Sequence, residues 1–123
     1  MTNAKIVMAD IFRALGNEHR LVIVEWLSDP RAHFPEQQDG DLIEDGVCVG
    51  FITEKIGLSQ PTVTGHLHNL AKAGIVTSKR IKNWVFYKLD RQRMDEAMAV
   101  LSGYGKQATR PHEQRADQNI RRK

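Results

Sequence analysis

Apolar side chains recur at three- and four-residue steps in the first part of the chain, which is the spacing of an amphipathic helix. One such face lies within residues 4–15 and comprises Ile6 or Val7, Ile11, Phe12 and Leu15. A second lies in the stretch GNEHRLVIVEWLSDP and comprises Leu21, Val24 and Leu27. Asn17 suits the N-cap of this second helix, and Pro30 suits its end. The pattern therefore predicts two helices before residue 30.

The periodicity then stops, and residues 30–46 read PRAHFPEQQDGDLIEDG. Two prolines, two glycines and an acidic cluster interrupt this segment, and such residues favour turns over helices or strands. We expect an irregular, exposed loop of unusual length, which is typical of either a functional or a merely mobile segment.

Helical spacing returns in two neighbouring segments that are separated only by GLS. The first covers residues 49–56 and ends at Gly57. In the second, LSQPTVTGHLHNLAKAG, Ser59 suits the N-cap, Pro61 fits the first turn and Gly74 fits a left-handed position at the end. Its apolar side comprises Val63, Leu67, Leu70 and Gly74. Two helices joined by so short a turn are typical of a helix-turn-helix.

Two short β-prone runs, IVTSKR and WVFYKL, flank IKN, where Asn83 is expected to take the positive φ of a tight turn. A basic hairpin directly after a helix-turn-helix forms a wing. A last helix is predicted over residues 91–101, with apolar positions at Met94, Ala97, Met98 and Leu101. The predicted fold class is mainly α with a small β-hairpin: a winged helix-turn-helix of five helices plus the wing.

A chain of 123 residues with 41% hydrophobic side chains is long enough for one compact core. Large apolar side chains almost vanish after Tyr104, so we assign residues 1–104 to one folded domain and residues 105–123 to a basic, disordered tail. The single Cys excludes an intrachain disulfide, and the sequence shows no membrane-length apolar run and no signal peptide. We therefore expect a cytoplasmic protein without membrane contact.

The formal net charge of +3 conceals a segregation of charges along the chain. Residues 36–45 carry five acidic and no basic side chains, whereas residues 49–93 carry eight basic and two acidic ones. The tail, residues 105–123, carries six basic and two acidic side chains. A basic segment of this kind is typical of a protein with a polyanionic partner, although a merely solvated surface has the same composition.

Three stretches resemble the ArsR/SmtB family of bacterial winged-helix repressors: LGNEHRLVIVEWL, VCVGFITEKIGLSQPTVTGHLHNLAKAGIV and VFYKL. They match the family's first core helices, helix-turn-helix and second wing strand in order and spacing, and the resemblance covers residues 9–101. It implies a cytoplasmic homodimer, joined by its first and last helices, that blocks transcription until an inducer weakens its hold on DNA.

The second helix of the helix-turn-helix presents polar side chains opposite its apolar side, as a helix that enters the major groove does. The predicted DNA contacts in and before this helix are Ser59, Gln60, Thr62, Thr64, Gly65, His68 and Lys72. Those in the wing, to phosphates or the minor groove, are Lys79, Arg80 and Lys82. Gly65 either allows close approach to DNA or is an indifferent position tolerated by its neighbours.

His66 lies near the boundary of the apolar side, so we expect it to be packed and hydrogen-bonded. His66 and His68 point about 200° apart on a helix and cannot share a metal ion.

The first and last helices carry more apolar side chains than the packing of one small winged helix needs. The predicted dimer interface comprises Met8, Ile11, Met98, Leu101 and Tyr104. A symmetric homodimer is the simplest closed arrangement that covers such a stripe.

Metal-sensing members of the resembled family begin their helix-turn-helix with Cys-Val-Cys, whereas positions 48–50 here read Cys-Val-Gly. One thiolate cannot supply three or four soft ligands, and residues 91–101 hold no His for the family's other metal site. We expect no metal and no cofactor, and interpret Cys48 as a small hydrophobe at the edge of the core. Two alternatives stay open: a redox thiol, or a metal site that Cys48 shares with a residue across the dimer or with His33, Glu36 or Asp39.

These observations predict a sequence-specific transcriptional repressor of the ArsR type that binds a pseudo-palindromic operator as a homodimer and is released by an unspecified inducer. The alternative is a metal- or thiol-responsive sensor that uses Cys48 with ligands from the acidic loop, which comprises residues 36–45. We do not expect an enzyme, because the sequence lacks a nucleophile–base constellation and a phosphate-binding glycine loop. The competing hypotheses are an enzyme or metal-storage module built on His33, Cys48 and the acidic loop, and a winged helix that binds proteins instead of DNA.

Overall fold

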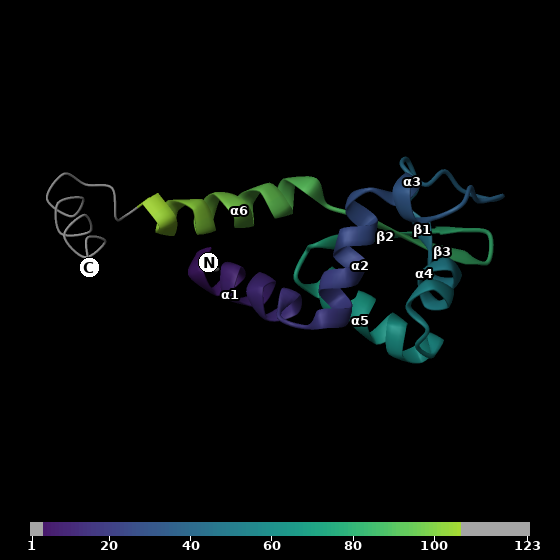
Figure 1. Ribbon diagram of the computed structural model, residues 1–123, viewed down its shortest axis with the longest axis horizontal. Coiled ribbons are helices and arrows are strands. Elements are labelled where there is room, and N and C mark those ends of the chain that lie inside the picture. Colours follow the sequence, from purple (N-terminus) through teal and green to yellow (C-terminus); the bar gives the residue numbers. More distant parts are fainter. Residues whose placement is uncertain (1–3, 107–123) are drawn as a thin grey trace, which may run out of the picture.

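The computed structural model describes residues 4–106, and side chains from residue 7 onward (Figure 1). These residues form six helices and one three-stranded sheet, arranged as a winged helix-turn-helix. The predicted fold class is confirmed, with one short helix and one short strand that the sequence pattern did not predict. Most of the predicted basic tail, from residue 107 on, lies outside the described residues.

The N-terminal helices α1 (Ala4–Leu15) and α2 (Glu18–Ser28) lie where the apolar periodicity predicts them. The side-chain oxygen of Asn17 accepts hydrogen bonds from the backbone N–H groups of His19 (3.0 Å) and Arg20 (3.1 Å). This satisfies two of the N–H groups that have no partner within the helix, so the predicted N-cap is confirmed.

The segment between α2 and the helix-turn-helix differs only in part from the predicted irregular, exposed loop. It begins with the short helix α3 (Pro30–His33), and the side chains of Phe34 and Leu42 are buried in the core. The carboxylate of Asp41 accepts hydrogen bonds from the backbone N–H groups two and three residues further on (2.9 and 2.8 Å), which closes a turn. The prediction is confirmed for residues 34–46, which form no helix or strand. It was wrong for the helical turn at residues 30–33 and for Phe34 and Leu42, which anchor the segment to the core.

Strands β1 (Val47–Cys48), β2 (Val76–Ile81) and β3 (Trp84–Leu89) form an antiparallel sheet in the order β1-β3-β2. The wing hairpin of β2 and β3 is confirmed, but Lys82 takes the positive φ of 55° that was expected at Asn83. The register causes this difference, because pairing of the strand ends leaves a two-residue turn that begins at Lys82. Strand β1 escaped prediction because two buried residues show no alternation.

The helix-turn-helix consists of α4 (Val49–Ile56) and α5 (Gln60–Lys72). Gly57, with φ of 76°, ends α4 in the left-handed conformation. The hydroxyl oxygen of Ser59 accepts the backbone N–H of Thr62 at 3.4 Å and so caps α5. The buried side of α5 is the predicted one and comprises Val63, Leu67 and Leu70.

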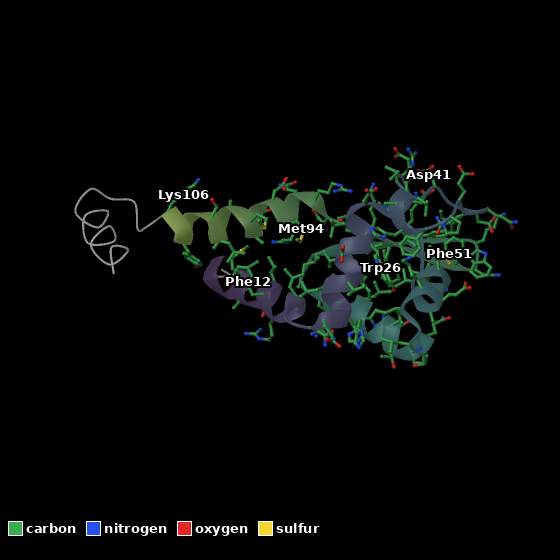
Figure 2. All side chains as sticks on the ribbon, in the orientation of Figure 1. Phe12, Trp26, Asp41, Phe51, Met94 and Lys106 are labelled. Carbon is green, nitrogen blue, oxygen red and sulfur yellow. The ribbon has the colours of Figure 1, made fainter. Side chains whose placement is uncertain are left out.

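The last helix, α6 (Arg91–Lys106), is longer than predicted and passes the expected domain end at Tyr104. Figure 1 shows that α6 extends away from the winged body, on the same side of the molecule as α1. Ala97 is its one buried residue, and Figure 2 shows Met94 on the side of α6 that faces α1. Because so little of this 16-residue helix is buried, packing against the rest of the same chain stabilises it only slightly.

The junction between the acidic loop and β1 depends on Gly46. Its φ is +103°, and an added Cβ would lie 2.4 Å from the carbonyl oxygen of Tyr87 on β3. We expect Gly46→Ala to lower the free energy of unfolding by about 2–4 kcal/mol, because the backbone would be strained and the pairing of β1 with β3 displaced. Urea denaturation measures this loss.

Gly57→Ala is the matched control, because Gly57 also has positive φ (+76°) but no atom within 4 Å of an added Cβ. This change should cost only about 1 kcal/mol. Equal losses for the two variants would mean that the contact with Tyr87 is not the cause.

Within residues 4–106, no helix combines the length and the apolarity needed to cross a membrane.

Candidate nucleic-acid interface

Helix α5 leaves one polar face uncovered. Among the predicted DNA contacts, the exposed residues are Ser59, Gln60, Thr62, Gly65, His68 and Lys72, whereas Thr64 is half-buried. The hydroxyl of Ser59 donates to the hydroxyl oxygen of Thr62 at 2.9 Å, so Ser59 is engaged in capping the helix. The Thr62 hydroxyl keeps its own hydrogen for a further acceptor, which makes Thr62 better placed for base contact than Ser59.

Gly65 lies on this exposed face, and an added Cβ there would meet nothing within 4 Å. Packing within the protein therefore does not require glycine at this position.

His66 belongs to the interior side of α5 and is not part of this polar face. A guanidinium nitrogen of Arg20 lies 3.2 Å from its Nδ1. Because a guanidinium only donates, Nδ1 is the acceptor and the proton of the neutral ring is on Nε2. Partial burial and, after it, the positive charge of Arg20 lower the pKa of His66. The predicted packed and hydrogen-bonded role of His66 is confirmed.

The wing places its basic side chains on the surface, but three of them already have partners. Lys79 Nζ lies 2.6 Å from the Asp45 carboxylate, and Lys82 Nζ lies 3.0 Å from that of Asp39. Lys88 Nζ donates to the carbonyl oxygen of Glu44 at 3.3 Å. The acidic loop and the basic wing are therefore in direct contact, a pairing that was not predicted from the sequence.

The hydrogen bond from Lys79 is the largest cause of a lowered pKa at Asp45, followed by the one from the backbone N–H of Asp41. Asp45 therefore stays charged at neutral pH. Arg80, the third predicted wing residue, is exposed, and no acidic partner contacts it within the described residues.

A second basic surface lies between α1 and α5. Arg13, Arg20 and Lys72, together with Asn69, line an open cleft of about 490 Å³. Arg13 also pairs with Asp10 at 2.6 Å. Arg13 and Arg20 were not among the predicted DNA contacts, because they lie on helices assigned to the core, and only their positions on polar helix faces could have marked them. Positive charge thus continues from α5 onto α1 and α2.

The predicted dimer residues do not all lie on one exposed surface. Met98, Leu101 and Tyr104 on α6 are 58%, 47% and 62% exposed, as an unpaired apolar stripe requires. Met8 on α1 is half-buried. Ile11 is 0% exposed, so its placement in the exposed stripe was wrong. It packs into the core of its own chain because it lies on the inner side of α1.

Cys48 is buried, with 8% of its surface exposed, as expected of a small side chain at the edge of the core. Its backbone N–H donates to the side-chain oxygen of Gln37 at 2.6 Å. Glu36 and Asp39 line the same cleft as Cys48, whereas His33 lines a different one. The described residues contain no group of three or more His, Cys, Asp or Glu arranged to hold a metal ion.

We expect Cys48→Ala to lower the free energy of unfolding by about 1 kcal/mol, through the small cavity that it leaves, and to leave DNA binding and induction unchanged. Thermal denaturation and a DNA-binding titration measure the two effects. Cys48→Ser, which buries a hydroxyl of similar size, is the control and should destabilise the protein more. Intact DNA binding combined with loss of induction in Cys48→Ala would make the thiol a sensor.

Comparison with known proteins agrees with this geometry. The sequence profile described as bacterial regulatory protein, arsR family, matches residues 42–78. The chain is 37% identical over 95 residues to the HTH-type transcriptional regulator YbzH of Bacillus subtilis. The matched region covers 77% of this chain and 91% of YbzH.

Solved structures show the same fold. An ArsR-like transcriptional regulator from Rhodococcus sp. RHA1 has a TM-score of 0.67 at 18% identity, covering 97% of this chain and 96% of that one. The homodimeric winged helix-turn-helix DNA-binding domain of Mb0332 from Mycobacterium bovis has a TM-score of 0.58 at 19% identity, covering 86% and 89%. The profile and the extended identity to YbzH lead to one conclusion: the chain belongs to the arsR family of bacterial regulatory proteins.

Proposed function

We propose that this protein is a transcriptional repressor that binds a pseudo-palindromic operator as a homodimer and is released by an inducer. The observation that carries the proposal is the exposed polar face of α5, which is capped at Ser59 and held by three buried apolar side chains. A helix anchored in this way can enter the major groove while Gln60 and Thr62 present donors and acceptors to base edges. The family is one of regulators, so the expectation that the chain is not an enzyme holds.

Helix α6 supports the proposed dimer. Its three exposed apolar side chains lie on a helix that leaves the winged body beside α1 (Figure 1). A second copy related by a two-fold axis would cover both stripes at once, and the Mycobacterium bovis domain of the same fold is homodimeric. Two α5 helices related in this way would read two half-sites about one helical turn apart, which supports the proposed pseudo-palindromic operator.

The wing supplies phosphate contacts. The side chains of Lys79 and Lys82 are exposed, although each is paired with a carboxylate of the acidic loop. Binding to DNA therefore exchanges a carboxylate partner for a phosphate partner. Such contacts position the protein on the duplex and carry no sequence information. We place this activity in the cytoplasm, where the DNA of a bacterium lies.

The experiment that tests the proposal is selection of bound fragments from random DNA, followed by anisotropy titrations against the selected site and a scrambled duplex. The expected result is a two-fold symmetric consensus, bound about 10³-fold or more tightly than the scrambled duplex. A family member that acts only as a protein-interaction module would select no consensus and show no steep salt dependence.

Asp45→Asn is expected to raise the affinity for the operator and for random DNA by similar factors, about two- to fivefold. The reason is that Lys79 loses its carboxylate partner, while the amide oxygen of Asn still accepts the backbone N–H of Asp41. Anisotropy titrations on both duplexes measure the effect.

Glu44→Gln is the matched control, because it removes the same charge from the same loop but its side chain pairs with no described wing lysine. In a Lys79→Ala background, Asp45→Asn should have no further effect on affinity. An equal increase with and without Lys79 would contradict the exchange of partners.

A further inference from the structure

A cleft with a volume of about 340 Å³ lies between the acidic loop and the sheet. Its walls include three aromatic rings, two carboxylates and the buried thiol: Phe51, Trp84, Phe86, Glu36, Asp39 and Cys48. Phe51, labelled in Figure 2, belongs to α4, and the other two rings belong to β3. The volume is sufficient for a small organic molecule.

The wall of this cleft is built into the fold. The side-chain amide of Gln37 donates to the carbonyl oxygens of Gly40 (3.3 Å) and Gly46 (3.0 Å), and its oxygen accepts the Cys48 N–H. Gly40 packs so closely on Phe86 that an added Cβ would lie 2.7 Å from the ring. The loop is therefore fixed against the sheet, so a ligand would meet a preformed site.

The chemistry of the walls selects a cation with an apolar body. Aromatic faces and carboxylates both attract positive charge, and the lining includes no Lys or Arg. Trp84 is 49% exposed, so the largest of the three rings still has surface available for a ligand. The protein uses the same chemistry elsewhere, where the ammonium of Lys55 lies 5.1 Å from the ring centroid of Trp26.

Other ligand classes fit less well. A metal ion needs three or more ligands, and the described residues hold no such group of His, Cys, Asp and Glu. The two carboxylates would repel an anion, and a neutral apolar molecule would gain no electrostatic stabilisation from them. We propose that the cleft between the acidic loop and the sheet binds a small alkylated ammonium ion, with Trp84 and Phe51 supplying aromatic surface and Glu36 supplying charge.

The two carboxylates have different states in the free protein. Asp39 is paired with Lys82, so a bound cation competes with the lysine for it. Glu36 has no hydrogen bond or ion pair within residues 4–106. Glu36 therefore offers the clearer test of charge, and binding is measured without DNA, so its outcome is independent of the proposed repressor function.

The test measures binding of choline and of its neutral isostere 3,3-dimethylbutan-1-ol to the full chain. Binding is monitored through the indole N–H signals of the two tryptophans in heteronuclear NMR spectra. We expect choline to shift the Trp84 signal saturably and to leave the Trp26 signal in place. The affinity for choline should be about tenfold higher than the affinity for the isostere. Glu36→Gln should weaken binding several-fold, whereas Glu44→Gln, a charge-matched change outside the cleft, should not.

Trp84→Phe assigns the signal, and Trp84→Ala should weaken binding by about tenfold, followed through the backbone amide of Phe51. Thermal denaturation of each variant checks that the fold is intact. Equal affinities for choline and its isostere, equal effects of the two glutamate substitutions, or no saturable shift would each overturn the proposal.

Discussion

Leu101→Glu is expected to convert the proposed dimer into a monomer and to lower operator affinity by a factor of about 10²–10³. Leu101 is 47% exposed in the single chain and lies in the α6 stripe that the proposed dimer buries. In a two-fold symmetric dimer, each copy would place the carboxylate of the introduced glutamate in the interface, and an unpaired buried charge costs about 3–5 kcal/mol. Light scattering measures the mass, and anisotropy on the selected operator measures the affinity.

Leu21→Glu is the matched control for the oligomeric state, because Leu21 is 52% exposed but lies on α2 instead of α6. This variant should remain a dimer. A Leu101→Glu protein that stays dimeric at micromolar concentration would show that α6 does not form the interface, and the proposed geometry of the two α5 helices would fail with it.

Gln60→Ala is expected to lower the affinity for the operator by about 1–3 kcal/mol while barely changing the affinity for random duplex DNA. Gln60 is exposed at the first position of α5, where recognition helices approach base edges. The measured quantity is the ratio of the two dissociation constants. Thr62→Ala should behave similarly, because its hydroxyl hydrogen has no acceptor among the described contacts.

Gln92→Ala provides the control, because Gln92 is an exposed glutamine outside the helix-turn-helix. It should leave the ratio unchanged. If Gln60→Ala reduced the affinity for both duplexes equally, Gln60 would contact the phosphate backbone and the assignment of base readout would be wrong.

Local signals in the sequence were sufficient for most of the fold. Asn17, Gly57 and Ser59 end or begin helices as predicted, because capping depends on side chains within a few residues. The positive φ of the wing turn was assigned one residue too late, to Asn83 instead of Lys82, because the register is set by pairing between the strands and not by residue preference.

The site was predictable only in part. The polar face of α5 follows from helical periodicity, but the pairs Lys79–Asp45 and Lys82–Asp39 join residues 34 and 43 positions apart. No local pattern contains such contacts. The segregation of acidic and basic charge was visible in the sequence, yet its meaning as a contact between loop and wing needed the tertiary structure.

The contact between the acidic loop and the wing has a consequence for the search along the chromosome. On random DNA a wing lysine gains a phosphate but gives up a carboxylate that lies about 3 Å away in the free protein, so each encounter is shorter. The wing lysine gives up the same carboxylate at the operator, but there the contacts to bases remain as an additional source of affinity. The loop therefore leaves the ratio of operator affinity to random-DNA affinity unchanged. It shortens the residence time on random DNA, which allows the repressor to sample more of the genome in a given time.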